Sequence, residues 1–303
     1  MLIVFSRRIP SNIKGDTIKN ITDLQNFIEV GKNDFMQRWN SFKGNDRVKN
    51  LSHSFSVTIN HIATWWAIGT SKASLLFTVI GPRLNISPKT PSWEVFQNNS
   101  PEEEDRVQVH LKEAVKLKKI AHVPREFWKF VSPTFVLQQG EKERLIYNAS
   151  VLNAFCPKVK VQLTAIDKVE EVLSFGARLL PIDLTSAYNQ CDVNLSDTKF
   201  LWIENKGDYY AYTTLAFGLR GAVHIFERFL NPLIVFLNKF WASFVYIDDI
   251  FVVTDRTKYT VKYFVHRDTF IHYILQNLGL KLNKKTFIFS TEEAEFIGWW
   301  LNT

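Results

Sequence analysis

Cysteine is scarce in this sequence, and long apolar runs are missing from it. Only Cys156 and Cys191 occur among 303 residues, too few for a disulfide framework and without the spacing of a metal site. No stretch approaches the ~20 consecutive apolar residues that a membrane span needs, so no membrane partner is expected. The apolar start, residues 1–5, is too short for a signal peptide and has its charges on the wrong side. These absences predict an intracellular protein of the cytoplasm or nucleus.

The sequence is rich enough in apolar and aromatic residues to form a substantial core. The hydrophobic fraction is 46% and the aromatic fraction 14%, which argues against a disordered chain. The length suffices for one large or two ordinary domains. The net charge is +7, and +6 of it lies in residues 1–100. A basic excess suits a polyphosphate partner, but surface lysines also serve solubility, so charge alone leaves nucleic-acid binding open.

Periodicity and capping signals predict several helices and hairpins. Ser100, followed by proline and acids, is typical of a helix start. Helices are predicted over residues 22–30, 101–120, 222–240 and 261–278 from apolar spacing and terminators. Strands around polar turns are predicted within residues 132–153, 198–214 and 244–253.

The stretch Phe244–Val253 carries two adjacent carboxylates between two apolar runs. This pattern predicts a β-hairpin with Asp248 and Asp249 at its tip. Two carboxylates this close repel by roughly 4 kcal/mol at 4 Å in an intermediate dielectric, so a cation is expected there. Taken alone, the pair is better explained as a polar turn. However, Asp183 ends another apolar strand, and three acids at two strand ends fit a two-metal site for phosphoryl transfer.

At these residues the chain resembles the reverse transcriptases of retroelements. Tyr246-Ile-Asp-Asp249 matches their paired-aspartate motif, and Asp183-Leu-Thr-Ser-Ala-Tyr188 matches the palm motif with the first metal-binding aspartate. Between them, residues 215–226 are similar to the template and nucleotide motif of the same enzymes. The Phe-Gly-Leu form of this motif is most similar to long-terminal-repeat and tyrosine-recombinase (DIRS-type) retrotransposons. The resemblance covers roughly residues 100–303.

The resemblance implies an α+β fold with the fingers and palm of a polymerase, in which helices back an antiparallel palm sheet. Residues 100–303 would form this domain, and residues 1–99 an N-terminal extension of unclear role. The stretch 64–86 is either ordinary core or similar to the segment that precedes the polymerase in tyrosine-recombinase retrotransposons. The family's thumb and ribonuclease H have no counterpart in the sequence, so a partner supplying them is also expected.

The implied activity is RNA-directed DNA synthesis. Deoxynucleotides would be added to a primer on an RNA or DNA template, with two Mg²⁺ ions, or Mn²⁺ in their place. Asp183 and Asp248 would bind the ions directly, and Asp249 would complete the negative field. The implied metal set is Asp183, Leu184, Asp248 and Asp249. Two rivals stay open: an inactive, retroelement-derived nucleic-acid-binding module, and a nucleotidyl cyclase, whose palm-like sheet also carries paired acids.

The family also places a lysine beside the departing pyrophosphate. Lys285 matches this position, and Lys284 or Lys281 are the alternates. A solvated basic turn explains the same residues equally well.

Other residues are implied to bind the incoming nucleotide. They are Arg144, Lys142, Tyr188, Phe217 and Gly218. Arg144 would grip the triphosphate, although a surface arginine explains it too. Tyr188 would exclude a 2′-hydroxyl, or is simply a tyrosine in an apolar cluster. The chain departs from the family at Gln138 and Gln139, where a lysine is usual, which leaves Lys142 as a substitute.

The resemblance also implies that two glycines and a tryptophan contact the primer and the template. The implied residues are Gly221, Gly298 and Trp299. Adjacent tryptophans at 299 and 300 can stack on nucleic acid, and burial of both against the palm is the alternative.

Overall fold

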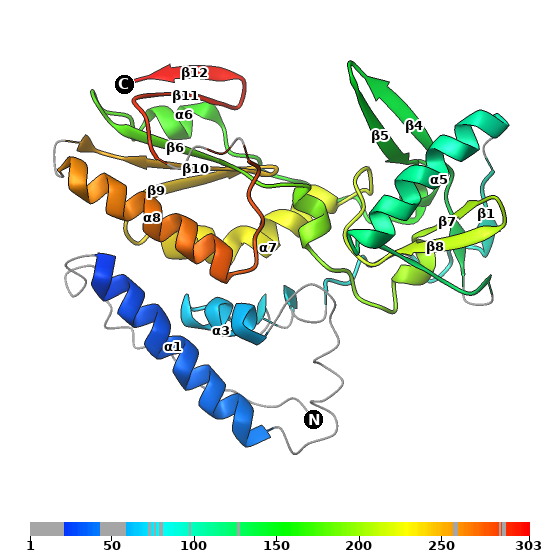
Figure 1. Ribbon diagram of the computed structural model, residues 1–303, viewed down its shortest axis with the longest axis horizontal. Coiled ribbons are helices and arrows are strands. Elements are labelled where there is room, and N and C mark those ends of the chain that lie inside the picture. The colour runs from blue at the N-terminus through cyan, green and yellow to red at the C-terminus, as the bar shows by residue number, and fades with distance from the viewer. Residues whose placement is uncertain are drawn as a thin grey trace.

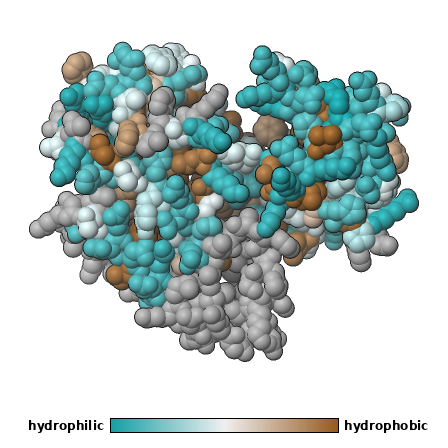
Figure 2. All heavy atoms as spheres, in the orientation of Figure 1, coloured by the Kyte–Doolittle hydropathy of each residue, from teal (hydrophilic) through white to brown (hydrophobic). Residues whose placement is uncertain are grey.

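The computed structural model describes residues 21–42, 59–71, 74–75, 77–78, 81–96, 98–125, 128–256, 260–284, 286 and 289–303. These residues form two lobes, and Figure 2 shows a groove between the lobes that opens at the top of the view. Within the described part of the chain, none of the helices combines the length and the apolar character of a membrane span.

The first lobe, which we call the palm lobe, is built on a three-stranded antiparallel sheet in the order β6-β10-β9. Its elements are α6 (Ile166–Glu170), β6 (Arg178–Asp183), η5 (Ala187–Gln190), α7 (Ala222–Leu237), β9 (Ala242–Tyr246), β10 (Asp249–Thr254), α8 (Val261–Asn277), β11 (Glu293–Phe296) and β12 (Trp299–Asn302). Helices α7 and α8 lie on one side of the sheet, and the β11–β12 hairpin lies on the other (Figure 1). The expected α+β fold with helices behind an antiparallel sheet is therefore present.

Both faces of this sheet are buried. Side chains alternate along each strand, so every strand contributes residues to both faces. On the helix side, Leu180 and Ile250 belong to the main hydrophobic cluster. On the hairpin side, Leu179 and Phe251 belong to a second cluster, in which the ring of Phe251 stacks on that of Phe296 with centroids 4.5 Å apart. The strands behind the acidic tip are thus held from both sides.

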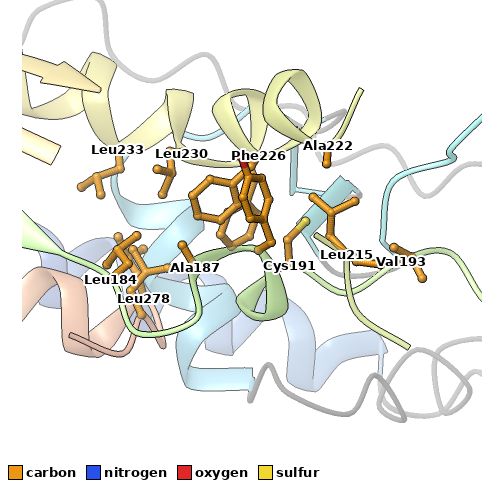
Figure 3. Packing of buried hydrophobic residues seen from close by; sticks show 14 of the residues in the cluster. Leu184, Ala187, Cys191, Val193, Leu215, Ala222, Phe226, Leu230, Leu233 and Leu278 are labelled. Carbon is orange, nitrogen blue, oxygen red and sulfur yellow. The ribbon is translucent and has the colours of Figure 1, made fainter. Parts of the chain in front are cut away.

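The main cluster continues from α7 to the segment after β6. Figure 3 shows Phe226, Leu230 and Leu233 of α7 facing Leu184 and Ala187, and all of these residues are buried. This contact fixes the start of η5, which begins at Ala187, shortly after Asp183 in the chain.

The second lobe, which we call the fingers lobe, contains a five-stranded mixed sheet in the order β1-β3-β7-β8-β2 and a separate β4–β5 hairpin. Its elements are β1 (Trp93–Glu94), α5 (Pro101–Lys116), β2 (Ile120–His122), β3 (Phe130–Val131), β4 (Thr134–Gln139), β5 (Lys142–Tyr147), η4 (Leu152–Phe155), η6 (Thr198–Phe200), β7 (Trp202–Asn205) and β8 (Asp208–Tyr212). Ser100 caps α5 by accepting a hydrogen bond from the backbone N–H of Glu103, as its sequence predicts.

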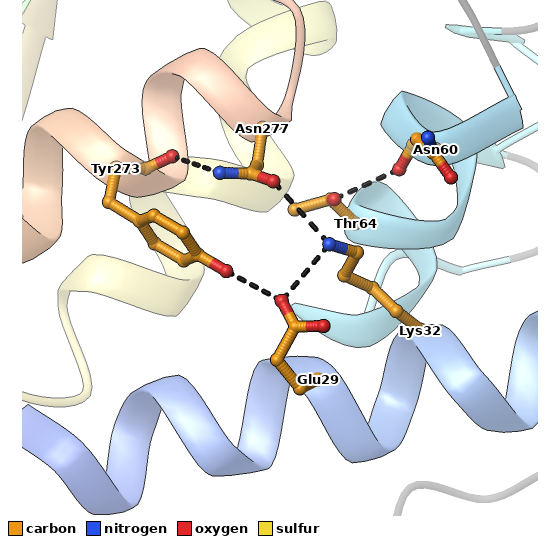
Figure 4. A network of polar contacts seen from close by, with 6 residues as sticks. All are labelled: Glu29, Lys32, Asn60, Thr64, Tyr273 and Asn277. Atoms are coloured by element: carbon orange, nitrogen blue, oxygen red, sulfur yellow. Dashed lines mark hydrogen bonds and ion pairs between the residues drawn. The ribbon is translucent and has the colours of Figure 1, made fainter.

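Two helices from the first part of the chain, α1 (Ile21–Phe42) and α3 (Ile59–Ala67), pack against α8. Trp65 of α3 is fully buried, and its indole N–H donates to the carbonyl of Leu278 at 3.1 Å. Figure 4 shows the polar part of this contact, in which Glu29 accepts from the Tyr273 hydroxyl at 2.6 Å and from Lys32 at 3.0 Å. These helices share the main hydrophobic cluster with the palm lobe.

Several of the predicted elements have different bounds in the structure. The helices predicted over residues 222–240 and 261–278 end at Leu237 and Asn277. The helix predicted over residues 22–30 extends from Ile21 to Phe42. The helix predicted to reach residue 120 ends at Lys116, because Lys118 takes a positive φ of 58° and Ile120 begins β2. The strand predicted from residue 198 begins instead as the 3₁₀ helix η6, and β7 starts at Trp202.

Candidate active site

The paired aspartates lie at the tip of the β9–β10 hairpin, as predicted. Tyr246 pairs with Asp249, so Ile247 and Asp248 alone form the loop between the strands. Ile247 has a φ of 58°, the sign that the first loop residue takes in the tightest hairpin turns. Glycine adopts this conformation without strain, whereas a β-branched residue rarely does. The turn therefore holds Asp248 at the apex with local backbone strain, which is often found at functional sites.

Asp183 faces this tip from the neighbouring strand. It is the last residue of β6 and pairs directly with Asp249, the first residue of β10. Opposed residues of an antiparallel pair point to the same face, with Cβ atoms roughly 4.5–5.5 Å apart. The register therefore brings two carboxylates that are distant in sequence to one end of the sheet, next to Asp248.

The electrostatics of these acids favour a cation. Burial, and after it the negative charges of Asp248, Asp183 and Glu295, together raise the pKa of Asp249 to about 6. Burial also raises the pKa of Asp248, against a backbone hydrogen bond that lowers it, and Asp183 adds to the rise. A cation among these carboxylates would relieve both the desolvation and the mutual repulsion.

Asp183 is held in place by the segment that follows α8. The Asn283 side-chain amide donates to Asp183 Oδ2 at 2.7 Å, and the Asn283 backbone N–H donates to the Asp183 carbonyl at 2.9 Å. The Thr286 hydroxyl also donates to that carbonyl, at 2.9 Å. The side-chain contact joins positions 100 residues apart, so no local sequence pattern signals that Asn283 contacts this carboxylate.

A cavity of about 650 Å³ lies between the acid-bearing end of the sheet and the β11–β12 hairpin. Its lining includes Asp183, Asp249, Glu295, Gly298 and Trp300. The side chains of Trp299 and Trp300 are 58% and 66% exposed, so the alternative that both tryptophans are buried against the palm is wrong. Glu295 is a further acid that the sequence alone does not connect with Asp249.

The donor set at the hairpin tip suits a hard divalent cation. Asp183, Asp248 and Asp249 supply carboxylate oxygens, the ligands that Mg²⁺ prefers, and they repel one another when no cation is near. Among the residues that the structure describes, no group of three or more His, Cys, Asp or Glu side chains is arranged so that it could hold a metal ion. Mg²⁺ is commonly bound by one or two carboxylates together with substrate phosphates, and the acids present fit that mode of binding.

Tyr188 lies behind the tip and has only 7% of its surface exposed. Its ring is 5.3 Å from that of Phe226 and 5.7 Å from that of Phe217, measured between centroids. Burial raises the pKa of the Tyr188 hydroxyl to about 12, and the charges of Asp248 and Glu227 contribute. Tyr188 therefore belongs to an apolar cluster and is also within electrostatic range of Asp248.

Phe217 and Gly218 line a second cavity of about 420 Å³ at the base of the β4–β5 hairpin. Phe217 is 71% exposed. Gly218 has a φ of 88° and accepts a hydrogen bond from Asn153 through its carbonyl at 2.9 Å. These contacts fix the loop that presents the Phe217 ring.

The β4–β5 hairpin carries the two cations expected to grip phosphates. Glu143 reaches α5, where its carboxylate accepts from Arg106 at 2.6 Å and lies 3.1 Å from His110 Nε2. Because side chains alternate, Lys142 and Arg144 lie on the opposite face of the strand, and both are exposed. Within the described part of the chain, neither of these two cations forms a hydrogen bond or an ion pair.

The remaining residues singled out in the sequence are found at turns or behind the acids. Gly221 precedes α7 with a φ of 85°, and Gly298 has a φ of 73° in the turn between β11 and β12. Leu184 is buried and forms an isolated bridge with Leu282. Lys285 lies outside the described residues.

The alternates to that lysine are Lys281 and Lys284, and both have exposed side chains. The backbone carbonyl of Lys281 accepts a hydrogen bond from Thr185 at 2.9 Å, which places Lys281 beside the turn that follows Asp183.

Residues 137–301, more than half of the chain, match the model of the family described as "Reverse transcriptase (RNA-dependent DNA polymerase)". The chain belongs to the reverse transcriptase family. This reverse transcriptase domain is 26% identical over 174 residues to the retrovirus-related Pol polyprotein from transposon 297 of Drosophila melanogaster. It is 23% identical over 175 residues to the corresponding polyprotein from transposon gypsy of the same species. Each match covers 55% of the chain but only 16% of the relative.

Solved structures similar to the domain include prototype foamy virus protease-reverse transcriptase. The native form gives a TM-score of 0.60 at 15% identity, covering 73% of this chain and 29% of that one. A foamy viral protease-reverse transcriptase in complex with double-stranded DNA gives 0.59 at 17% identity, covering 73% and 38%. The fingers and palm fold expected from the sequence is therefore confirmed.

Proposed function

We propose that this reverse transcriptase domain catalyses template-directed addition of deoxynucleotides to the 3′ end of a primer. The observation that supports this most directly is the register of β6 against β10, which sets Asp183 opposite Asp249 and next to Asp248. Positioning and charge neutralisation account for most of the catalysis of phosphoryl transfer. Carboxylates that bind metal ions, together with basic side chains that hold phosphates, are therefore sufficient for this chemistry.

Asp183 and Asp248 are the proposed ligands of two Mg²⁺ or Mn²⁺ ions, and Asp249 and Leu184 complete the metal set. When bound, such ions lower the pKa of the primer hydroxyl and neutralise the pyrophosphate that leaves. The raised pKa values of Asp248 and Asp249 support a site in which a cation would stabilise the ionised acids. Asn283 holds the carboxylate of Asp183 in a fixed orientation. Lys285 stays the proposed proton donor to pyrophosphate.

The proposed contacts with nucleotide and nucleic acid come from both lobes. Arg144 and Lys142 would bind the triphosphate, and Tyr188 would restrict the sugar to deoxyribose. Phe217, Gly218 and Gly221 are assigned to the nucleotide and template, and Gly298 and Trp299 to the primer. The free cations of the fingers hairpin and the exposed tryptophans beside the acids support these roles, as does the DNA-bound state of one similar structure.

Other expectations from the sequence also stay proposals. These are the long-terminal-repeat or tyrosine-recombinase subclass, the boundary between residues 1–99 and 100–303, the RNA or DNA template and the supply of further domains by a partner. An intracellular location, in the cytoplasm or nucleus, is likewise proposed. The free state of both buried cysteines supports it, because free thiols are usual in a reducing compartment.

The direct test is Mg²⁺-dependent incorporation of a deoxynucleotide on a primed RNA template. Asp248→Asn should abolish incorporation, because it removes a proposed metal ligand while keeping the shape of the side chain. Asp167→Asn is the matched control, since Asp167 is exposed on α6 of the same lobe. Equal incorporation by wild type and Asp248→Asn would refute the proposal.

A nucleic-acid-binding module without catalytic activity is the second candidate. The observation in its favour is that β4 ends in Gln138 and Gln139, so the described cations of the hairpin tip are on one strand only. This candidate predicts that wild type binds a primer–template duplex but incorporates nothing, and that Asp248→Asn binds the duplex equally well.

A further inference from the structure

The turn immediately after Asp183 lies between two lysines from different parts of the chain. The Lys119 ammonium donates a hydrogen bond to the Ser186 hydroxyl at 3.1 Å. On the other side, the carbonyl of Lys281 accepts from the Thr185 backbone N–H at 2.9 Å. Ser186 has a φ of 48°, a conformation that few residues other than glycine adopt. These contacts join the end of α5 and the segment after α8 to a turn within three residues of a catalytic carboxylate.

Lys119 is firmly anchored at the junction of α5 and β2. Its carbonyl accepts hydrogen bonds from the Thr214 hydroxyl at 3.1 Å and from the Thr213 backbone N–H at 3.3 Å. Its own backbone N–H donates to the carbonyl of Ala114 at 2.9 Å. The root of the side chain is thus fixed, and only the flexible stem and the ammonium group are left to move.

The ammonium of Lys119 is poorly compensated where it lies. It has three N–H donors, and the Ser186 hydroxyl takes one of them. Among the described residues, no carboxylate lies within ion-pair distance of Lys119 Nζ. Burial lowers the pKa of Lys119, the negative charge of Glu113 opposes this effect, and the positive charge of Lys281 lowers the pKa further. An anion close to Lys119 would offset both the burial and the repulsion by Lys281 that lower this pKa.

The chemistry of the anion follows from the position of the two lysines. They flank the turn that follows Asp183, and the fingers hairpin offers further exposed cations at Lys142 and Arg144. A lysine ammonium is a compact charge suited to phosphate oxygens. A chain of phosphates has oxygens enough to engage several cations at once, which favours a triphosphate over a single phosphate as the ligand.

We propose that Lys119, assisted by Lys281, binds the triphosphate of the incoming nucleotide by exchanging the Ser186 hydroxyl for a phosphate oxygen. This inference rests on the proposed function and adds to it a cation that the fingers hairpin does not supply. The exchange breaks no covalent bond, and the proton stays on the ammonium. Lys119 would thus be a substrate-binding residue that reaches the phosphates from the turn that follows Asp183.

The test compares Lys119→Met and Lys281→Met with Lys116→Met, which removes an exposed lysine at the end of α5. Losing one charge-assisted hydrogen bond to phosphate should raise the KM for the deoxynucleotide about tenfold or more in Lys119→Met. The kcat should change much less, because the catalytic acids are untouched. Lys281→Met should raise the KM to a smaller extent, and Lys116→Met should leave it at the wild-type value. Lys119→Arg keeps the charge and should restore most of the affinity.

A second measurement keeps the result independent of catalysis. Inorganic tripolyphosphate without metal is titrated calorimetrically into each variant, and its affinity should fall in Lys119→Met by a factor similar to the rise in KM. If wild type incorporates nothing but Lys119→Met still loses tripolyphosphate affinity, the proposed function fails while the phosphate site stands. Wild-type KM and tripolyphosphate affinity in a folded Lys119→Met protein would overturn the phosphate site. Should Lys119→Met unfold, Lys119→Gln decides by the same two readouts.

Discussion

Replacing Asn283 by alanine should weaken metal binding without loosening the fold. In the structure the Asn283 amide donates to Asp183 Oδ2 at 2.7 Å, so the substitution removes the donor that orients this carboxylate. The backbone N–H of residue 283 still donates to the Asp183 carbonyl at 2.9 Å, and Thr286 keeps its own hydrogen bond to the same carbonyl. The segment therefore stays tied to β6, and the substitution isolates the contribution of the side chain.

The magnitude follows from the kind of hydrogen bond that is lost. A hydrogen bond to a charged acceptor contributes roughly 1.5–3 kcal/mol. If this energy holds Asp183 in its metal-binding orientation, its loss lowers the rate of incorporation roughly 10- to 100-fold. Asn283→Asp should be worse, because it also sets a like charge beside Asp183, with a repulsion of roughly 4 kcal/mol at 4 Å in an intermediate dielectric.

Two readouts check this expectation. The Mg²⁺ concentration for half-maximal incorporation should rise in the order wild type, Asn283→Ala, Asn283→Asp. Binding of Mn²⁺ to the free protein, followed by electron paramagnetic resonance, should weaken in the same order without any nucleic acid. Asn231→Ala, which truncates an exposed asparagine on α7, serves as the matched control. Wild-type Mn²⁺ affinity and rate in a folded Asn283→Ala protein would refute the assigned role.

Three further outcomes are expected. The pKa of Asp249 is raised from 3.8 to about 6 in the folded protein, so the folded state binds a proton at this carboxyl more tightly than the unfolded state does. The free energy of unfolding should therefore fall as the pH rises from about 4 to about 6. Asp249→Asn should remove this loss and raise the melting temperature at pH 7 in metal-free buffer. Gly279→Ala should lower the free energy of unfolding in urea by more than about 1 kcal/mol, since φ is +83° and the new Cβ would lie 2.6 Å from His61 Nδ1; His61→Ala in the same chain should recover part of the loss. Trp300→Ala should weaken binding of a primer–template duplex, by roughly 1–3 kcal/mol if the indole stacks on a base, and leave the melting temperature unchanged because the side chain is 66% exposed.

The parts of the fold that local rules determine could be predicted from the sequence. The β9–β10 hairpin follows from two apolar runs around a polar tip, and the start of α5 follows from the cap at Ser100. The end of α5 could not be read in the same way. The predicted continuation to residue 120 is overridden because Ile120 pairs with Tyr212 in β2–β8, and tertiary pairing outweighs a weak local preference for helix.

The three aspartates of the site could be predicted because they stand in sequence motifs that follow one another in a known order. The residues that contact the segment around Asp183 became visible only in the structure. Asp183, Asp248 and Asp249 stand in recognisable stretches, so their proximity could be expected before their register was known. Lys119 and Asn283 stand in basic and polar stretches that surface solubility explains equally well. Their contacts reach Ser186 and Asp183 across long sequence separations, so no local sequence pattern indicates them.

The architecture behind the acids explains how an unfavourable group of charges can be held in place. Repulsion among the acids, and the strained φ of Ile247, both act to loosen the hairpin tip. The residues just behind the tip, including Leu180, Ile250 and Phe251, are fully buried, and burial of such a side chain contributes roughly 1.5–3 kcal/mol. Since one sheet face packs on α7 and α8 and the other on β11–β12, the strands cannot separate to relieve the repulsion without exposing one of these cores. A bound cation relieves the repulsion at the tip and leaves both cores intact, as does protonation of Asp249 at low pH.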